Sequence, residues 1–259
     1  MNKIIKEQIN RLKPSATLAI NEESNKLKKS GKKVYKFGFG QSPFPVPESI
    51  VSALKNNANK NTYLPMQGLE ELRSAIANQL NQSNNNDFVA EDIIVGPGTK
   101  ELMFLTQIAF AGEILLPAPS WVSYQPQAVI AKNKVHWIQT SSSSNWFPTA
   151  EQLENKIKSI KNQNLILFMN SPNNPSGMVC KNLQEITEVA KKHKLIILSD
   201  EIYSRLTFDS QYKSISNFYP EGTIVSTGLS KWCGAGGWRL GFFAIPKQLE
   251  ELKNSLKIL

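Results

Sequence analysis

The chain has 259 residues, of which 41% are hydrophobic and 9% aromatic, and it carries a net charge of +9. This composition excludes a disordered protein, and the length suits one large domain with an appendage. The 30 basic residues are scattered over segments of helical pattern. Solvated helix faces therefore account for the charge better than nucleic-acid binding, for which the sequence shows no recognition motif.

The sequence also lacks signals for other compartments and partners. Two cysteines, Cys180 and Cys233, make neither a disulfide framework nor a C-x-x-C pair. Residues 1–13 are charged and have no signal-peptide core, and no apolar run approaches the roughly 18–20 residues that span a bilayer. We therefore expect a cytoplasmic protein with no membrane partner, no nucleic-acid partner and no metal site.

The first predicted elements form an N-terminal arm and its connection to the rest of the chain. The pattern predicts a helix over residues 16–29, closed by Gly31. Three prolines make residues 40–47 a loop, and the last of them suits the first turn of a helix that runs to residue 56. Apolar residues on one face predict a further helix over residues 68–80.

From residue 93 onward, short apolar runs alternate with helical segments. The predicted strands cover residues 93–95, 113–116, 135–140, 165–169, 195–198, 223–226 and 240–245. The predicted helices between them cover residues 99–111, 150–160 and 183–192, with capping patterns at Thr149-x-x-Gln152 and Asn182-x-x-Glu185. Such strands indicate an α/β fold, with a mostly parallel seven-stranded sheet that helices cover on both faces.

Polar residues gather directly after the predicted strands. In open α/β sheets the carboxyl ends of the strands meet at one edge, where ligands bind. The residues at these ends are Gly98 and Thr99, the segment 117–121, Asn174, Asp200 and Tyr203, and Ser230 and Lys231. Five loops from separate strands are therefore expected to converge on one site.

Lys231 and Arg239 are the most prominent single candidates. Lys231 follows an apolar strand and precedes glycines that admit a ligand close to the backbone, as a lysine nucleophile requires; a surface lysine in a turn is the alternative. Arg239 offers a planar fork that suits a phosphate, although an isolated arginine is more often a surface ion-pair partner. The run Gly96-Pro97-Gly98-Thr99-Lys100 opens a helix, whose N–H groups attract phosphate, or it is a simple strand-to-helix turn. Glu101 breaks the pattern G-x-G-x-x-G and argues against a dinucleotide site.

Four further residues can contact a planar ring. Asp200 emerges from a buried strand and can hold a ring nitrogen protonated, or it caps a helix. Tyr203 can donate to a ring oxygen and Trp121 can stack on the ring, or both pack in a core. Asn174 lies in the run of residues 170–177, which holds more asparagines than a turn requires, although such a composition is ordinarily that of a turn.

Together these motifs resemble the class I/II aminotransferases, which are pyridoxal-phosphate (PLP) enzymes of fold type I, and their aspartate aminotransferase branch in particular. The similar stretches are Tyr63-x-x-x-x-Gly68-x-x-x-Leu72-Arg73, Gly98-Thr99-Lys100, Pro117-x-Pro119-x-Trp121-x-x-Tyr124, Asn174-Pro175-Ser176-Gly177, Ser199-Asp200-Glu201-Ile202-Tyr203, and Ser230-Lys231 through Gly237-Trp238-Arg239-Leu240-Gly241. They follow in family order from about residue 31 to residue 246. The resemblance implies a PLP-binding large domain over residues 46–259, preceded by an N-terminal arm and small-domain segment over residues 1–45.

The resemblance also implies how the ring of the cofactor is held. Lys231 would form a Schiff base with PLP and move the proton at the substrate α-carbon. Asp200 would pair with the pyridine nitrogen, and Asn174 and Tyr203 would hydrogen-bond the phenolic oxygen. Trp121 would stack on the ring. Catalysis would then rest on Lys231, Asp200 and Tyr203. The implied substrate contacts are Gly40, Trp121 and Asn174.

The phosphate of the cofactor has its own implied contacts. Arg239, Ser230 and the N–H groups of Thr99 and Lys100 would hold it. Tyr63 would reach the phosphate of a neighbouring subunit, which implies a homodimer.

The chain departs from the family pattern at three places. The position three residues before the lysine, which often holds a hydroxyl, is Gly228, with Thr227 and Ser230 on either side. Ser176 replaces the commoner threonine. Family members continue past residue 259 with a small C-terminal domain, whose arginine grips the substrate carboxylate. We therefore expect that domain to be missing here and the arm to expose apolar surface.

The implied function is the transfer of an amino group from an L-amino acid to a 2-oxo acid. Because the substrate clamp is not matched, a non-catalytic fragment that binds PLP or dimerises is one alternative. A PLP-dependent carbon–sulfur β-lyase on the same fold is the other.

Overall fold

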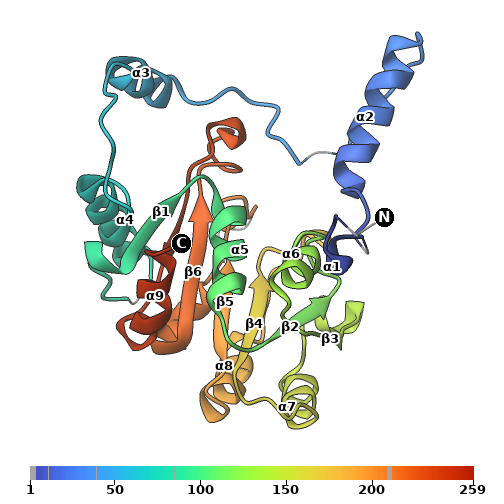
Figure 1. The fold of residues 1–259 in the computed structure, drawn as a ribbon, viewed down its shortest axis with the longest axis vertical. Coiled ribbons are helices and arrows are strands. Elements are labelled where there is room, and N and C mark those ends of the chain that lie inside the picture. The colour runs from blue at the N-terminus through green and yellow to red at the C-terminus, as the bar shows by residue number, and fades with distance from the viewer. Residues whose placement is uncertain (1–3, 11, 39, 85, 209–211) are drawn as a thin grey trace.

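A single seven-stranded sheet forms the centre of the protein in a computed structural model, which describes residues 4–10, 12–38, 40–84, 86–208 and 212–259 (Figure 1). The strand order is β1-β7-β6-β5-β4-β2-β3. The strands are β1 (Ile93–Gly96), β2 (Glu113–Ala118), β3 (Val135–Gln139), β4 (Leu165–Asn170), β5 (Ile196–Asp200), β6 (Thr223–Gly228) and β7 (Gly241–Ala244). Every predicted strand is confirmed, with bounds that move by one or two residues.

The sheet is mostly parallel, as predicted. β2 pairs in parallel with β3 and β4, and β4, β5 and β6 continue in the same direction. Among the strands described, only β7 runs opposite to its neighbours, β1 and β6. All six residues of β4 are buried, which explains why this central strand reads as a continuous apolar run.

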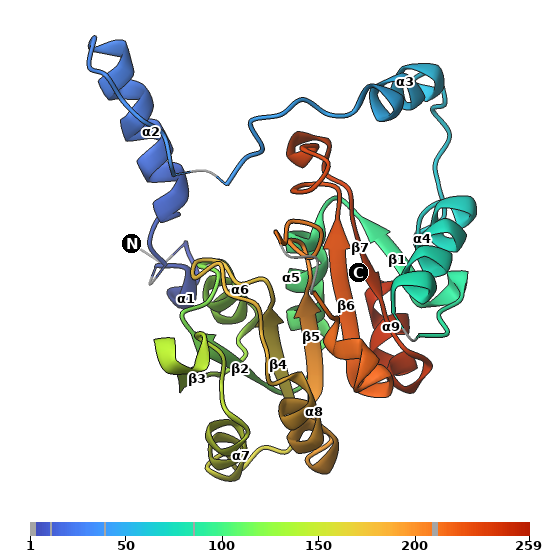
Figure 2. The ribbon, with the colours of Figure 1, turned by 180° about the vertical axis from the view of Figure 1, so that it is seen from behind.

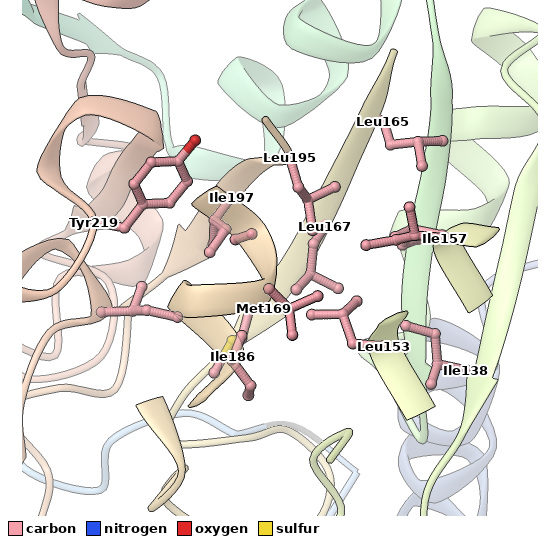
Figure 3. Close-up of a cluster of buried hydrophobic side chains, with 14 of the residues drawn as sticks. Ile138, Leu153, Ile157, Leu165, Leu167, Met169, Ile186, Leu195, Ile197 and Tyr219 are labelled. Atoms are coloured by element: carbon pink, nitrogen blue, oxygen red, sulfur yellow. The ribbon is translucent and has the colours of Figure 1, made fainter. Parts of the chain in front are cut away.

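Helices cover both faces of the sheet. The helices of the body are α4 (Glu70–Ser83), α5 (Thr99–Ala109), α6 (Tyr124–Ala131), α7 (Ala150–Lys158), α8 (Leu183–Lys192) and α9 (Glu250–Leu256). α5, α6 and α9 pack on one face, the nearer one in Figure 1, and α4, α7 and α8 pack on the other. In Figure 3, Leu153 and Ile157 of α7 and Ile186 of α8 face Leu167 and Ile197 of the sheet.

Short 3₁₀ helices complete the connections. They are η1 (Ala90–Asp92), η2 (Ser142–Ser144), η3 (Ile215–Asn217), η4 (Pro220–Gly222), η5 (Gly236–Trp238) and η6 (Lys247–Leu249).

The helix starts test the predicted capping patterns. Thr149 and Gln152 form a capping box: the Thr149 Oγ1 accepts from the Gln152 N–H at 3.1 Å, and the Gln152 Oε1 accepts from the Thr149 N–H at 2.9 Å. The helix start predicted at Asn182 is confirmed, because Asn182 directly precedes α8, but its side chain does not cap the helix. The Asn182 side chain donates instead to the backbone oxygen of Pro148 at 2.9 Å and makes no capping bond.

Only part of the arm predicted over residues 1–45 stands away from the body of the protein: α1 (Glu7–Asn10) lies against α6, whereas α2 (Ala16–Lys29) extends away from the sheet. α3 (Glu48–Asn57) follows the arm, and Figures 1 and 2 show α2 and α3 beyond the edge where β5 and β6 end. Apolar side chains of this region are exposed, including Phe37 at 92% and Phe44 at 77%. The expected exposure of apolar surface is thus confirmed, while the domain boundary at residue 45 stays a prediction. No helix in the described ranges is long and apolar enough to cross a membrane.

Candidate active site at the carboxyl ends of the strands

Lys231 lies on the loop that follows β6 and is half-buried. Its Nζ donates to the backbone oxygen of Gly40 at 2.8 Å and lies 5.7 Å from the centre of the Tyr203 ring. Burial lowers the pKa of Lys231 and the charge of Arg239 lowers it further, whereas Asp200 opposes both. A lowered pKa makes the neutral amine, the form that acts as a nucleophile, more available.

Asp200 ends β5 and is 4% exposed. Its Oδ2 accepts from the hydroxyl of Tyr124 at 2.6 Å, and its Oδ1 accepts from the backbone N–H of Ile202 at 3.3 Å. Burial raises the pKa of Asp200 to about 6, against these two hydrogen bonds and the charge of Lys231, which lower it. The carboxyl is therefore a buried anion at pH 7 and above that is suited to pair with a cationic ligand group.

Asn174 and Tyr203 come together beside Asp200. The Asn174 Nδ2 lies 3.4 Å from the Tyr203 hydroxyl. Asn170, the last residue of β4, joins the two loops: its Nδ2 donates to the backbone oxygen of Asp200 at 2.9 Å, and its Oδ1 accepts from the Asn174 N–H at 2.7 Å. Burial raises the pKa of Tyr203, so this hydroxyl stays a hydrogen-bond donor across the neutral range.

Arg239 lies against the start of α5. A Cβ added to Gly98 would sit 2.1 Å from the Arg239 Nη2, and a Cβ added to Gly241 would sit 2.3 Å from the Thr99 nitrogen. Because Gly98 and Gly241 have no Cβ, the Arg239 guanidinium can approach the N–H groups of the first turn of α5. A guanidinium beside a helix N-terminus is an arrangement that binds phosphate.

Gly228 is closely packed where the family resemblance would place a hydroxyl. A Cβ at Gly228 would lie 2.6 Å from the backbone oxygen of Leu240, so no larger residue fits without a shift. Of the two neighbouring hydroxyls, that of Thr227 donates to the backbone oxygen of Glu201 at 3.2 Å. Ser230 is half-buried on the same loop as Lys231.

Trp121 is half-buried just before α6. Its ring meets the Tyr124 ring edge-on, with centroids 5.3 Å apart, and the Lys100 Nζ lies 5.9 Å from its centre. The loop that precedes α6 therefore brings an aromatic face to the same edge of the sheet as Asp200.

Comparison with known proteins identifies the family. The family model for aminotransferase class I and II matches residues 32–259. This chain belongs to the class I and II aminotransferases. It is 33% identical over 255 residues to an aspartate aminotransferase of Bacillus sp. (strain YM-2), a match that covers 94% of this chain and 64% of that protein. It is 31% identical to a probable aspartate/prephenate aminotransferase of Rickettsia typhi, over 95% of this chain and 64% of that one.

Solved structures of aminotransferases share the fold. The structure of aspartate aminotransferase from Thermus thermophilus with maleate has a TM-score of 0.90 and 28% identity, covering 99% of this chain and 67% of that one. The aspartate aminotransferase from Rhizobium meliloti has a TM-score of 0.89 and 26% identity, covering 98% and 65%. The chain spans about 64% of the length of the curated aminotransferases named above.

Besides Trp121 and the residues near the start of α5, the predicted site residues fall into two groups. Lys231, Asp200, Tyr203 and Asn174 lie at neighbouring strand ends, and Gly40 joins them through the Lys231 amine. Tyr63 is separate: its side chain is 105% exposed, so none of the residues that the structure describes covers it.

Two residues of the site were not assigned a role from sequence. Tyr124 stands only at the end of the motif Pro117-x-Pro119-x-Trp121-x-x-Tyr124, and Asn170 is not among the predicted site residues.

Proposed function

We propose that this chain carries the cofactor-binding machinery of a PLP-dependent aminotransferase, which moves an amino group from an L-amino acid to a 2-oxo acid. The observation that carries the proposal is the setting of Lys231: its amine has a lowered pKa and interacts electrostatically with the buried carboxyl of Asp200 and with Arg239, which lies against the start of α5.

The residues present fit PLP by their chemistry. The cofactor has an aldehyde, a pyridine nitrogen and a phosphate. An amine suits the aldehyde, a buried carboxylate suits a protonated ring nitrogen, and a guanidinium at a helix N-terminus suits the phosphate. The glycine at position 98 leaves the space that the guanidinium occupies. When bound, PLP supplies an electron sink that stabilises negative charge at the substrate α-carbon.

Each side chain then has a defined task. Lys231 would attach the cofactor, and its amine would move the proton at the substrate α-carbon. Asp200 would keep the ring nitrogen protonated, while Asn174 and Tyr203 would hydrogen-bond the ring oxygen. Trp121 would cover one face of the ring. Phosphate binding falls to Arg239, Ser230 and the N–H groups of Thr99 and Lys100, with Tyr63 contributed by a second copy.

Chemical mapping tests the assignment of Lys231. We expect protein incubated with PLP and reduced with borohydride to carry the cofactor on the peptide that contains Lys231. Lys231→Ala should lose the modification, while Lys100→Ala, which removes an amine 5.9 Å from the centre of the Trp121 ring, should retain it. Modification of a different lysine in the wild-type chain would overturn the assignment.

Turnover separates the aminotransferase from the two alternatives. The relatives are named aspartate or aspartate/prephenate aminotransferases, so aspartate is the first donor to test. We expect the absorbance of bound PLP to change with a donor and to recover with a 2-oxo acid. No change with any L-amino acid would favour a non-catalytic fragment. Pyruvate released from cystathionine without an acceptor would favour the β-lyase.

A homodimer is part of the proposal, because Tyr63 is fully exposed in its own chain. Sedimentation should give twice the mass of the 29.0 kDa chain. Tyr63→Phe should weaken PLP binding in the dimer, and a monomer that binds PLP equally well with either residue would contradict the shared site. A cytoplasmic location stays a prediction.

A further inference from the structure

Tyr124 connects two residues of the proposed cofactor site. It is the first residue of α6 and is only 1% exposed. Its ring packs on Phe168 of β4 with centroids 5.2 Å apart, and the Trp121 ring meets it edge-on at 5.3 Å. Its hydroxyl lies 2.6 Å from the Asp200 Oδ2. One side chain therefore contacts both the ring-stacking candidate and the buried carboxyl.

Apart from the Tyr124 hydroxyl, the described structure gives the Asp200 carboxyl only a longer hydrogen bond to stabilise its ionised form. Its other hydrogen bond comes from the backbone N–H of Ile202 at a longer 3.3 Å. The remaining ionisable groups that interact with its charge are Lys231 and Tyr203 on the site loops and Glu201 and Tyr212 on the other side of the strand.

The direction of the Tyr124 hydrogen bond is fixed by its own environment. Burial raises the pKa of Tyr124 well above its usual value, and the neighbouring Asp200 raises it further, so the phenol keeps its proton and donates it. A phenol that donates to a carboxylate stabilises the ionised form and fixes the orientation of the carboxyl plane. A carboxylate accepts at about four lone-pair positions, so positions remain for a ring nitrogen.

We propose that Tyr124 is a positioning residue of the aminotransferase site. Its hydroxyl holds the Asp200 carboxyl ionised and in a fixed orientation, and its aromatic ring fixes the position of the Trp121 ring. This inference rests on the proposed function, because the pyridine nitrogen of PLP is the group that Asp200 would meet. It assigns to Tyr124 no contact with substrate or cofactor.

Tyr124→Phe is the direct test, since it removes the hydroxyl and keeps the aromatic packing. The first measurement uses cofactor-free protein labelled with ¹³C-aspartate, with Asp200→Asn to assign the carboxyl signal. We expect Tyr124→Phe to raise the pKa of Asp200 by about one unit or more, the effect of losing a charge-assisted hydrogen bond. An unchanged titration of Asp200 would overturn the role of Tyr124.

The second measurement is the dissociation constant for PLP between pH 6 and pH 9. Only ionised Asp200 can pair with a protonated ring nitrogen, so Tyr124→Phe should weaken binding about tenfold near pH 6 and little at pH 9. A merely structural role would weaken binding equally at every pH, and that result would also overturn the proposal.

Control variants separate the possible failures. Tyr219→Phe removes the hydroxyl of a tyrosine that is 7% exposed on the opposite face of the sheet, and it should change neither measurement. If Tyr124→Phe does not fold, Tyr124→Met removes the same hydroxyl with a flexible side chain and should give the same two shifts. Wild-type protein that binds no PLP at any pH would overturn the proposed function. A wild type that binds PLP with no shift in the variants would overturn only the role of Tyr124.

Discussion

Replacing Gly98 by alanine tests the proposed phosphate subsite. Gly98 precedes α5 with φ at 100° and ψ at 152°, a conformation that residues with a Cβ rarely adopt. The alanine Cβ would lie 2.1 Å from the Arg239 Nη2 and 2.8 Å from its Cζ. The guanidinium must therefore move away from the helix start, and the backbone becomes strained in addition.

The two effects have separate magnitudes. Strain of this kind costs about 1–3 kcal/mol of folding free energy. A displaced guanidinium loses a charge-assisted contact with phosphate, worth about 1.5–3 kcal/mol, which corresponds to a roughly 10- to 150-fold higher dissociation constant for PLP. We expect Gly98→Ala to show both losses, in urea unfolding and in fluorescence titration with PLP.

Gly31→Ala provides a matched control. Gly31 also has positive φ, at 84°, but a Cβ there would meet nothing within 4 Å. This variant should lose about 1–2 kcal/mol of stability and keep wild-type affinity for PLP. If Gly98→Ala binds PLP as tightly as Gly31→Ala does, the assignment of Arg239 and the α5 start to the phosphate is refuted.

Three further predictions concern stability, each measured by urea unfolding. Leu167→Ala, at a side chain with 0% exposure, should cost about 2–5 kcal/mol, whereas a loss under 1 kcal/mol would contradict the packing of that face. Lys253→Met breaks a buried 2.8 Å ion pair with Asp92 and should cost about 3–5 kcal/mol, which Asp92→Asn in the same chain should largely restore. Burial raises the pKa of Glu201 from 4.5 to about 7, so the folded state binds this proton more tightly and stability should fall between pH 4.5 and pH 7, by on the order of 3 kcal/mol from this group. Glu201→Gln should flatten that decline, and an unchanged slope would show that other groups cause it.

Local sequence patterns were sufficient for all the strands described and for most of the helices. Buried parallel strands read as apolar runs because both of their faces are covered, and each such run in the sequence became a strand. The Thr149 capping box was readable because its partners lie three residues apart. α6 was missed because it is short and contains Pro126. The helix start at Asn182 was predicted, but its side chain makes no capping bond because it donates to the distant backbone oxygen of Pro148.

The sequence by itself therefore determined the fold class and the placement of Lys231, Asp200 and Asn174 at strand ends, since both follow from short-range periodicity. Tertiary structure alone decided which groups meet there. The hydroxyl of Tyr124 reaches Asp200 across 76 residues, and the amine of Lys231 reaches Gly40 across 191. The antiparallel direction of β7, which brings Arg239 beside Gly98, was likewise decided by the tertiary structure. Such contacts depend on how helices and strands pack in three dimensions, and no local pattern of the chain encodes them.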